Sequence, residues 1–321
     1  MQRRTGPTFH IATRLFPRRI RHATYVLYAF FRLADEVVDD PHPPPPDDQR
    51  AALEHIREVA VGNRQSTDPV LDGFAAVRKV HDIPASEVEA FIDAMLADVS
   101  DARRDRVVFD TEADRTKYLR GSAVAVAYMM LAVMNPPRPS VARPHARALG
   151  EAFQLTNFIR DVREDIDEYD RVYIPRTRLD RAGVEVGDIC AHRCTSAFRD
   201  VIRAELEYAE TKYRKGVAGI GMLPEGCRFP VLLAAIFYAE YHRLIRGQGC
   251  DVLSDPPSLR PSRYLSLIVR SRWHWFRTQN AEAVFYRVSP IDPSPSAHGQ
   301  IRVPVHQDRP GRDPTRTGGP E

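Results

Sequence analysis

Apolar residues recur at steps of three and four positions along most of the chain, which is the spacing of helices with one buried face. One clear series is Ile20, Ala23, Leu27, Phe30, Phe31, Ala34 and Val38, and another is Ala148, Ala152, Leu155, Phe158, Ile159 and Val162. The same spacing predicts further helices over residues 47–61, 68–80, 85–99, 113–134, 197–217, 229–247 and 262–286. No segment has a convincing strand pattern, so the sequence predicts an all-α protein.

Prolines separate the predicted helices. Pro41 and the run 43–46 follow the first long helix, Pro136 and Pro137 follow another, and Pro224 lies between two more. Proline ends a helix because its ring removes an N–H donor and clashes with the preceding turn. We therefore place helix boundaries at these positions.

No linker of disordered composition interrupts residues 8–286, which we interpret as a single helical domain. Residues 1–7 are expected to form a flexible N-terminus. The last 33 residues, 289–321, contain seven prolines and four glycines and lack apolar periodicity. This composition predicts a disordered tail.

Composition and charge limit the class of protein. With 321 residues, 43% of them hydrophobic, the chain can bury a large core, which excludes natively unfolded and fibrous classes. A net charge of +3 does not indicate a nucleic-acid partner, and four cysteines are too few for a disulfide scaffold, so we expect a reducing, cytoplasmic location. The longest uncharged stretch, 121–137, is shorter than the roughly 20 residues of a membrane-spanning helix.

Carboxylates cluster at the end of the first long predicted helix. Asp35 and Asp39 are four residues apart, hence on one helix face, and Glu36 and Asp40 share another face. Four carboxylates beside apolar residues repel one another and disfavour burial, which points to a bound cation. A solvated acidic helix end balanced by Arg32 remains the alternative interpretation.

A second polar series favours the cation. Asn157, Asp161 and Asp165 recur at i, i+4 and i+8, with Arg160 and Arg163 beside them. Two helices that each carry a carboxylate ladder can hold divalent cations inside a helical bundle. Oxygen ligands without histidine or cysteine favour Mg²⁺ or Mn²⁺, which keep coordination positions for water and phosphate. The pattern therefore suggests a diphosphate substrate.

Five segments follow one another in a family-specific order: TFHIATRLFP at 8–17, YAFFRLADEVVDD at 28–40, YLRGSA at 118–123, QLTNFIRDVRED at 154–165 and RVYIP at 171–175. Together they resemble the squalene and phytoene synthase family. A later stretch with Arg228, Tyr238 and GCDV at 249–252 extends the resemblance, which covers roughly residues 8–286. The GSA form of the third segment and the long spacer between Asp165 and Arg171 resemble phytoene synthases more than squalene synthases.

The resemblance implies an isoprenoid synthase fold, a helical bundle around a central active-site cavity, and head-to-head prenyltransferase activity. Two molecules of geranylgeranyl diphosphate would join through prephytoene diphosphate to give 15-cis-phytoene, and the enzymes of carotenoid biosynthesis that follow would be partners. Two ionised diphosphates bring about six negative charges into one cavity, so about three Mg²⁺ or Mn²⁺ ions are implied as cofactors, without NADPH.

The family motifs also assign roles to individual residues. The implied metal ligands are Asp35, Asp39, Asn157, Asp161 and Asp165. The positions near the diphosphates are Arg32, Arg160, Arg171 and Tyr238. The implied catalytic residues are Asp35, Asp39, Asp161, Asp165 and Tyr173. A wall that keeps water from the allyl cation would include residues such as Tyr28, Phe30, Phe31, Tyr128, Met129 and Phe153, although each is also typical of an ordinary core.

Some positions depart from the family pattern. Arg120 stands where many relatives have tyrosine, Ala127 where glycine is common, and Asp255 where arginine is frequent, which leaves their effect on substrate choice open. The alternatives are a squalene or dehydrosqualene synthase that uses farnesyl diphosphate, a class I terpene cyclase, and a non-catalytic scaffold relative. Retention of all five metal-motif residues argues against the scaffold.

The N-terminal segment is basic. Seven arginines and no acidic residue precede Asp35. Arg14, Arg18, Arg19 and Arg21, with Leu15 and Phe16 among them, suggest peripheral contact with the inner face of the membrane. Arginines that only face solvent or offset the acidic helix are the alternative.

Overall fold

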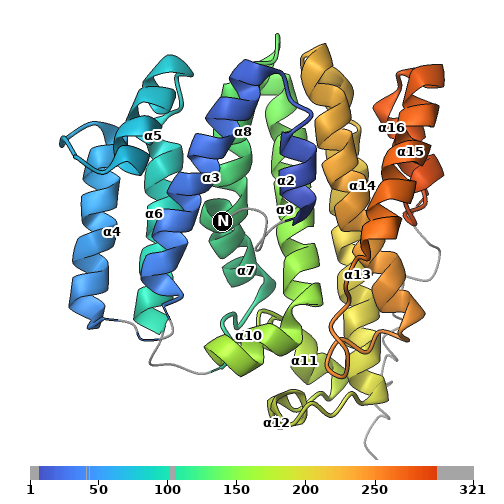
Figure 1. The fold of residues 1–321 in the computed structure, drawn as a ribbon. Coiled ribbons are helices and arrows are strands. Elements are labelled where there is room, and N and C mark those ends of the chain that lie inside the picture. The colour runs from blue at the N-terminus through green and yellow to red at the C-terminus, as the bar shows by residue number, and fades with distance from the viewer. Residues whose placement is uncertain (1–6, 41, 43, 102–105, 295–321) are drawn as a thin grey trace, which may run out of the picture.

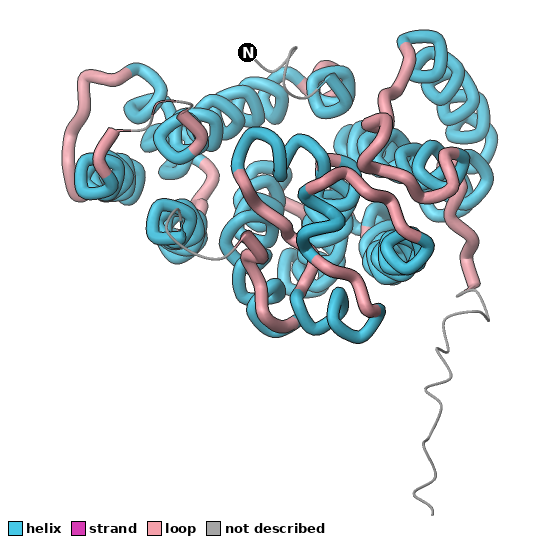
Figure 2. Tube along the Cα trace, turned by 90° about the horizontal axis from the view of Figure 1, so that it is seen from below, coloured by secondary structure: helices cyan, strands magenta, loops and turns pink. Residues whose placement is uncertain are grey.

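The computed structural model describes residues 7–40, 42, 44–101 and 106–294. Within these ranges every regular element is a helix, and the single β-type contact is an isolated parallel bridge between Val107 and Val172 (Figures 1 and 2). The all-α prediction is confirmed. The predicted N-terminus 1–7, apart from Pro7, and the predicted tail beyond Ser294 lie outside the described residues.

The first half of the chain forms α2 to α8. Their bounds are α2 Pro7–Thr13, α3 Arg18–Val38, α4 Pro46–Val61, α5 Pro69–Val80, α6 Ala85–Asp101, α7 Glu112–Leu119, a π-helical turn η1 Arg120–Ala125, and α8 Val126–Met134. Figure 1 shows α4 to α6 together on one side of the bundle, with α3 and α8 nearer its centre.

The second half forms α9 to α16. Their bounds are α9 Pro139–Arg160, α10 Val162–Tyr169, α11 Arg176–Ala182, α12 Val186–Cys190, α13 Ser196–Val217, a 3₁₀ turn η2 Ile220–Met222, α14 Glu225–Gly247, α15 Pro261–Thr278, and α16 Ala281–Val288. Helices α10 to α12 lie at one end of the bundle, and α13 to α16 form the side opposite α4 to α6 (Figure 1).

Two predicted helices are interrupted. Residues 113–134 remain helical but pass through the π turn at 120–125, where an added Cβ at Gly121 would lie 2.3 Å from Ala90 O, so only glycine fits this close approach. The predicted helix 262–286 divides after Thr278, because Gln279 takes a left-handed conformation (φ 47°) and Asn280 caps a new helix through Ala283 N.

The buried apolar side chains form two clusters. One is built mainly from α3 to α6 and α8, and the other mainly from α9, α13, α14 and the C-terminal helices. Among the described residues, none of the helices combines the length and apolar character needed to span a bilayer.

The packed part of the protein extends beyond the predicted boundary at Ser289. Ile291 is 1% exposed and belongs to the second core cluster. Arg214 Nε donates a hydrogen bond to the carbonyl oxygen of Asp292 (2.8 Å). The prediction that the disordered tail begins at 289 is therefore wrong for residues 289–292. Ile291 is a single apolar residue, which is too few to form a periodic pattern in the sequence.

Candidate active site

A cavity of about 590 Å³ is lined by helices from both core clusters. One part of its lining, here called the polar end, consists of Arg32, Asp35, Asp39, Asp98, Tyr118, Asn157, Arg160, Asp161, Asp165, Arg171 and Tyr173. Most of the remaining lining is apolar. The cavity thus combines a charged region with a large water-excluding surface, as an ionic substrate with a hydrocarbon tail requires.

The first acidic segment divides its carboxylates between the cavity and solvent. Asp35 and Asp39 line the cavity, whereas Glu36 and Asp40 are exposed. Arg32 also lines the cavity, and its Nε pairs with Glu36 at 3.2 Å. Helical spacing alone could not decide whether Asp35 and Asp39 or Glu36 and Asp40 face the interior. The packing of α3 turns Asp35 and Asp39 toward the cavity.

The second series crosses a helix boundary and still lines one surface. Helix α9 ends at Arg160 and α10 begins at Val162, so the continuous helix assumed from the sequence bends at Asp161. Two backbone bonds preserve the register, from Asp161 N to Asn157 O (2.9 Å) and from Asp165 N to Asp161 O (2.8 Å). Asn157, Asp161 and Asp165 therefore all face the cavity.

The carboxyls of the two series are held away from water and close to one another. Burial and the charge of Asp39 raise the pKa of Asp35 to about 7. Burial and the charge of Asp161 raise the pKa of Asp165 to about 8. Raised pKa values of this kind are typical of buried carboxylates that have too little positive charge around them to offset their own when no ligand is bound.

Asp161 has a partner in its own segment. Arg160 donates two hydrogen bonds to it, from Nε to Oδ1 and from Nη2 to Oδ2, both 2.6 Å long. Burial disfavours the charged guanidinium, but these bonds hold the pKa of Arg160 above its ordinary value. Arg163, also predicted to flank the series, is turned outward and donates to the carbonyl oxygen of Ser254 (2.8 Å).

The loop that carries Arg171 and Tyr173 is fastened to the segment before α7. Val172 N donates to Arg106 O (2.8 Å), and Val108 N donates to Val172 O (3.1 Å). Arg171 Nη1 donates to the hydroxyl of Tyr173 (3.2 Å), and the Tyr173 ring stacks on Phe158 with centroids 4.4 Å apart. Backbone and ring contacts thus fix both side chains at the polar end.

Asp98 is a site residue that the sequence interpretation missed. It is 6% exposed, lines the cavity and accepts a hydrogen bond from the Tyr118 hydroxyl (2.9 Å). Burial raises the pKa of Tyr173, and the charge of Asp98 raises it further. A signal was available, because Asp98 falls three residues after Met95 on the apolar face of its helix.

Tyr238, expected beside the diphosphates, does not line the cavity. Its ring packs against Phe9 and Phe153, at centroid distances of 4.9 and 4.7 Å, and burial raises the pKa of its hydroxyl while the nearby charge of Arg160 opposes that rise. Among the departures from the family pattern, Ala127 lines the cavity, Arg120 pairs with Glu87 (2.8 Å), and Asp255 is exposed.

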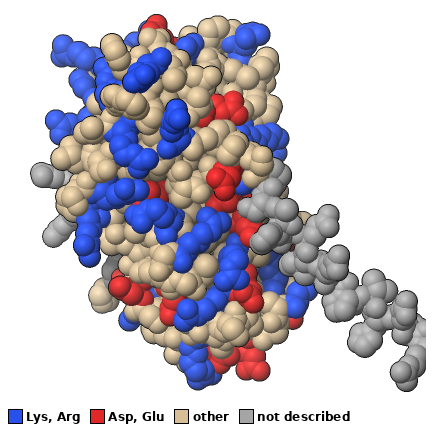
Figure 3. Space-filling view, turned by 90° about the vertical axis from the view of Figure 1, so that its right-hand side faces the viewer, with Lys and Arg blue, Asp and Glu red and all other residues tan. Residues whose placement is uncertain are grey.

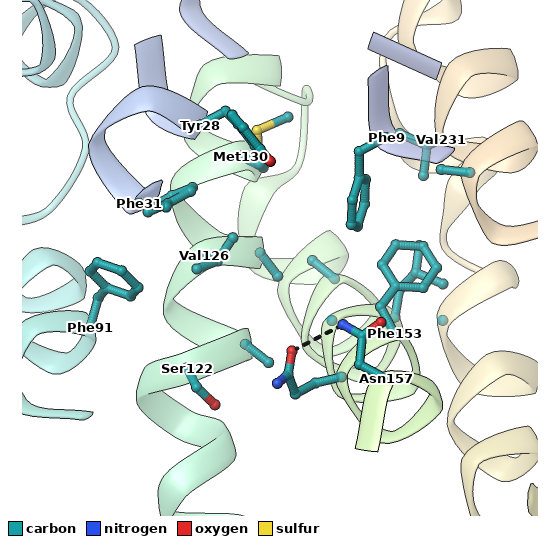
Figure 4. Close-up of a pocket in the computed structure, with 18 of the residues that line it drawn as sticks. Phe9, Tyr28, Phe31, Phe91, Ser122, Val126, Met130, Phe153, Asn157 and Val231 are labelled. Atoms are coloured by element: carbon teal, nitrogen blue, oxygen red, sulfur yellow. Dashed lines mark hydrogen bonds between the residues drawn. The ribbon is translucent and has the colours of Figure 1, made fainter. Parts of the chain in front are cut away.

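The apolar wall differs from the expected set. Tyr28, Phe31 and Phe153 line the cavity as expected, but Phe30 and Met129 are fully buried in the first core cluster, and Tyr128 lies beneath Arg143 with 3.7 Å between guanidinium carbon and ring centroid. Figure 4 shows Phe31 and Phe91 on one side of the cavity and Phe9 and Phe153 on the other. Helical periodicity identifies apolar faces but not which apolar side chains border a void.

Comparison with known proteins places the chain in a family. The family model described as squalene/phytoene synthase matches residues 2–264. The chain belongs to the squalene/phytoene synthase family. It is 36% identical over 262 residues to a phytoene synthase of Thermus thermophilus, which covers 79% of this chain and 83% of the relative. It is 31% identical over 280 residues to a 15-cis-phytoene synthase of Paracoccus sp., which covers 85% and 88%.

Solved structures agree with the squalene/phytoene synthase assignment at the level of the fold. A dehydrosqualene synthase in complex with a ligand has a TM-score of 0.75 at 22% identity, covering 86% of this chain and 94% of the other. A squalene synthase from Alicyclobacillus acidocaldarius has a TM-score of 0.67 at 24% identity, covering 78% and 92%. The expected isoprenoid synthase helical fold is confirmed.

Members of the squalene/phytoene synthase family use divalent metal ions with diphosphate substrates, and the residues present here fit such ions. Asn157 Oδ1 is buried and has no hydrogen-bond partner in the part of the chain that the structure describes. Over the same residues, no three His, Cys, Asp or Glu side chains gather closely enough to hold an ion alone. An ion would therefore complete its coordination with Asn157, water or phosphate oxygens.

Proposed function

We propose that this protein is a phytoene synthase that joins two geranylgeranyl diphosphates head to head, through prephytoene diphosphate, to 15-cis-phytoene. The observation that carries the proposal is the pair of aspartate-bearing segments, α3 and α9–α10, whose carboxylates face one cavity with an otherwise largely apolar lining. The phytoene synthase relatives at 31–36% identity support the choice of product within the family. The proposed catalytic domain covers residues 8–286 and extends at its C-terminal end through Asp292.

In this proposal Mg²⁺, about three ions per site, is held by Asp35, Asp39, Asn157, Asp161 and Asp165. The ions, when bound, neutralise diphosphate charge and assist departure of the leaving group. The raised pKa values of Asp35 and Asp165 support this role, because carboxyls that repel one another gain most from added positive charge.

Arginines at the polar end bind and orient the diphosphates. Arg32, Arg160 and Arg171 come from different elements and line the same region. A guanidinium donates paired hydrogen bonds to phosphate oxygens and keeps its charge, so these side chains stabilise the diphosphate as its C–O bond breaks. Tyr238 packs on the Phe153 ring, and the charge of Arg160 opposes the rise in pKa that burial causes at its hydroxyl, so we keep it among the residues beside the diphosphates.

The apolar wall holds the prenyl chains and excludes water from the allyl cation. Phe31 and Phe91 face the cavity with ring centroids 5.1 Å apart, and Phe9 and Phe153 lie at 5.7 Å. Each aromatic face offers on the order of 0.5–2 kcal/mol of attraction to a cation in a dry site. Tyr173 and Tyr118 hold their protons at the polar end, because burial raises the pKa of both phenols.

Incubation of the purified protein with Mg²⁺ and radiolabelled prenyl diphosphates tests the proposal. Geranylgeranyl diphosphate should give phytoene without NADPH, and farnesyl diphosphate should react more slowly. Faster turnover of farnesyl diphosphate to dehydrosqualene, or to squalene when NADPH is added, would instead assign one of the alternative activities. The structural neighbours named as dehydrosqualene and squalene synthases make this the relevant comparison.

A further inference from the structure

Helix α15 carries apolar side chains on two opposite faces. Its inner face buries Tyr264, Leu267 and Ser271 against the bundle. On the outer side, four large apolar residues follow at steps of four, four and three, so they share one face. We call them the α15 outer stripe, and their exposed fractions are Leu265 63%, Val269 59%, Trp273 54% and Phe276 83%.

This exposure is concentrated on one helix. Among the described residues, seven large apolar side chains are exposed, and the other three are scattered as Leu15, Val80 and Val141. Isolated exposed apolar residues are ordinary on a protein surface, whereas a continuous row marks an interaction surface. The stripe therefore needs an occupant.

Positive charge surrounds the stripe. Helix α15 contains four arginines and no acidic residue. Arg263 pairs with Glu240, whereas Arg270, Arg272 and Arg277 have no carboxylate partner within the described residues. Burial and the charges of Arg287, Arg270 and Arg277 lower the pKa of His274, in keeping with a local excess of positive charge. Figure 3, which views this side of the molecule, shows many Lys and Arg side chains separated by uncharged surface.

We propose that the α15 outer stripe and its flanking arginines dock the protein on an anionic bilayer surface. Apolar side chains that include Trp and Phe, bordered by arginines, match the interfacial region of a membrane, where rings enter the acyl boundary and guanidinium groups meet lipid phosphates. A second copy of this chain is a poorer occupant. A two-fold interface would bring two arginine-rich helices together, and one stripe is small beside the roughly 800 Å² that each partner buries in a stable complex.

The choice of a lipid as the occupant of this surface rests on the proposed function. Geranylgeranyl chains and phytoene partition into bilayers. Trp275 of α15 contacts Phe229 of α14 with centroids 5.8 Å apart, and the next two residues, Pro230 and Val231, line the cavity. Two helices, α15 and α14, therefore lie between the stripe and the apolar wall of the cavity.

The basic N-terminal segment is a weaker docking surface than the sequence suggested. Phe16 is 7% exposed and lines the cavity, so it is not available to a membrane. Leu15, at 46%, is the one large apolar residue of that segment exposed in the described structure. The Arg18 and Arg19 pair therefore serves as a comparison in the experiment below.

Vesicle sedimentation with the full-length protein, without substrate, tests the inference. Vesicles of phosphatidylcholine alone are compared with vesicles that also contain phosphatidylglycerol. The exposed-ring variant is Trp273→Ser/Phe276→Ser and the charge variant is Arg270→Gln/Arg277→Gln. The matched controls are Val80→Ser/Val141→Ser, which removes exposed apolar residues from α5 and α9, and Arg18→Gln/Arg19→Gln.

Wild-type protein should bind the anionic vesicles in a salt-sensitive manner and should bind the neutral ones at least tenfold less. The ring variant should lose at least about tenfold in partitioning, and the charge variant about fivefold per arginine, the factor that corresponds to about 1 kcal/mol. Both control variants should bind as wild type does. Unchanged binding of the ring variant, or loss confined to Arg18→Gln/Arg19→Gln, would overturn the assignment to α15.

Sedimentation velocity and a detergent assay separate the remaining outcomes. If wild type is a dimer and Trp273→Ser/Phe276→Ser is a monomer, the stripe is a subunit interface and the membrane proposal fails. Product formation from detergent-dispersed geranylgeranyl diphosphate should be the same for wild type and the ring variant. Vesicle binding without any phytoene formation would overturn the proposed function while leaving the docking surface intact.

Discussion

Arg171 Nη1 lies 3.9 Å from Oδ1 of Asp39, although the two residues are 132 positions apart in the chain. Arg171 follows the second aspartate segment, and Asp39 closes the first. The same guanidinium donates to Tyr173. Its charge also opposes the rise in pKa that burial causes at both Asp39 and Asp165, so one side chain acts on both acidic segments at the polar end of the cavity.

This link predicts the effect of removing the guanidinium. Arg171→Gln should lower kcat/KM by at least about tenfold, because the diphosphate loses a charged donor and Asp39 loses a neighbouring cation. Arg163→Gln, on a side chain turned toward Ser254, serves as control. Steady-state kinetics in which both variants match wild type would remove Arg171 from the site.

The two acidic segments should both be essential. Asp39→Asn or Asp161→Asn should lower turnover by at least about a hundredfold while the far-UV circular dichroism stays unchanged, since each removes a charge from the proposed metal site but no packed side chain. Asp40→Asn, on an exposed neighbour of Asp39, should keep near wild-type activity. Near wild-type turnover by Asp161→Asn would contradict the assignment of the second segment.

Without metal, Asp35→Asn should stabilise the protein at pH 8. The pKa of Asp35 is raised from 3.8 to about 7, so the folded state binds its proton more tightly than the unfolded chain does. The stabilising contribution of this proton is complete below about pH 4 and is lost as the pH rises through 7. Melting curves in EDTA should show the advantage of Asp35→Asn growing from pH 5 to pH 8. An advantage that does not change with pH would contradict the buried charge.

The C-terminal boundary predicts a contrast between two truncations. Ending the chain after Ser294 keeps Ile291 in the core and the bond from Arg214 to Asp292, so the free energy of unfolding should be unchanged. Ending it after Val288 removes both and should cost about 2 kcal/mol, the typical effect of exposing a buried aliphatic site. Chemical denaturation of the two truncated proteins measures the difference, and equal stability would show that residues 289–292 add nothing.

Rules that apply within a single helix were enough to predict much of this structure. The 3.6-residue period identified the long helices, because the period depends only on which side chains share a face. The spacing of four between Asp35 and Asp39 placed them together for the same reason, and the backbone bonds through Asp161 kept the second series in register across a bend. Fold class and the candidate acidic ligands therefore followed from the sequence.

Tertiary packing decided which faces border the cavity. It turned Asp35 inward and Glu36 outward, brought Asp98 beside Tyr118, and packed the Tyr238 ring on Phe9. None of these outcomes depends on spacing within one helix. Each depends on how helices distant in the sequence rotate about their axes when they pack, and that rotation is fixed by the whole core and the cavity left within it.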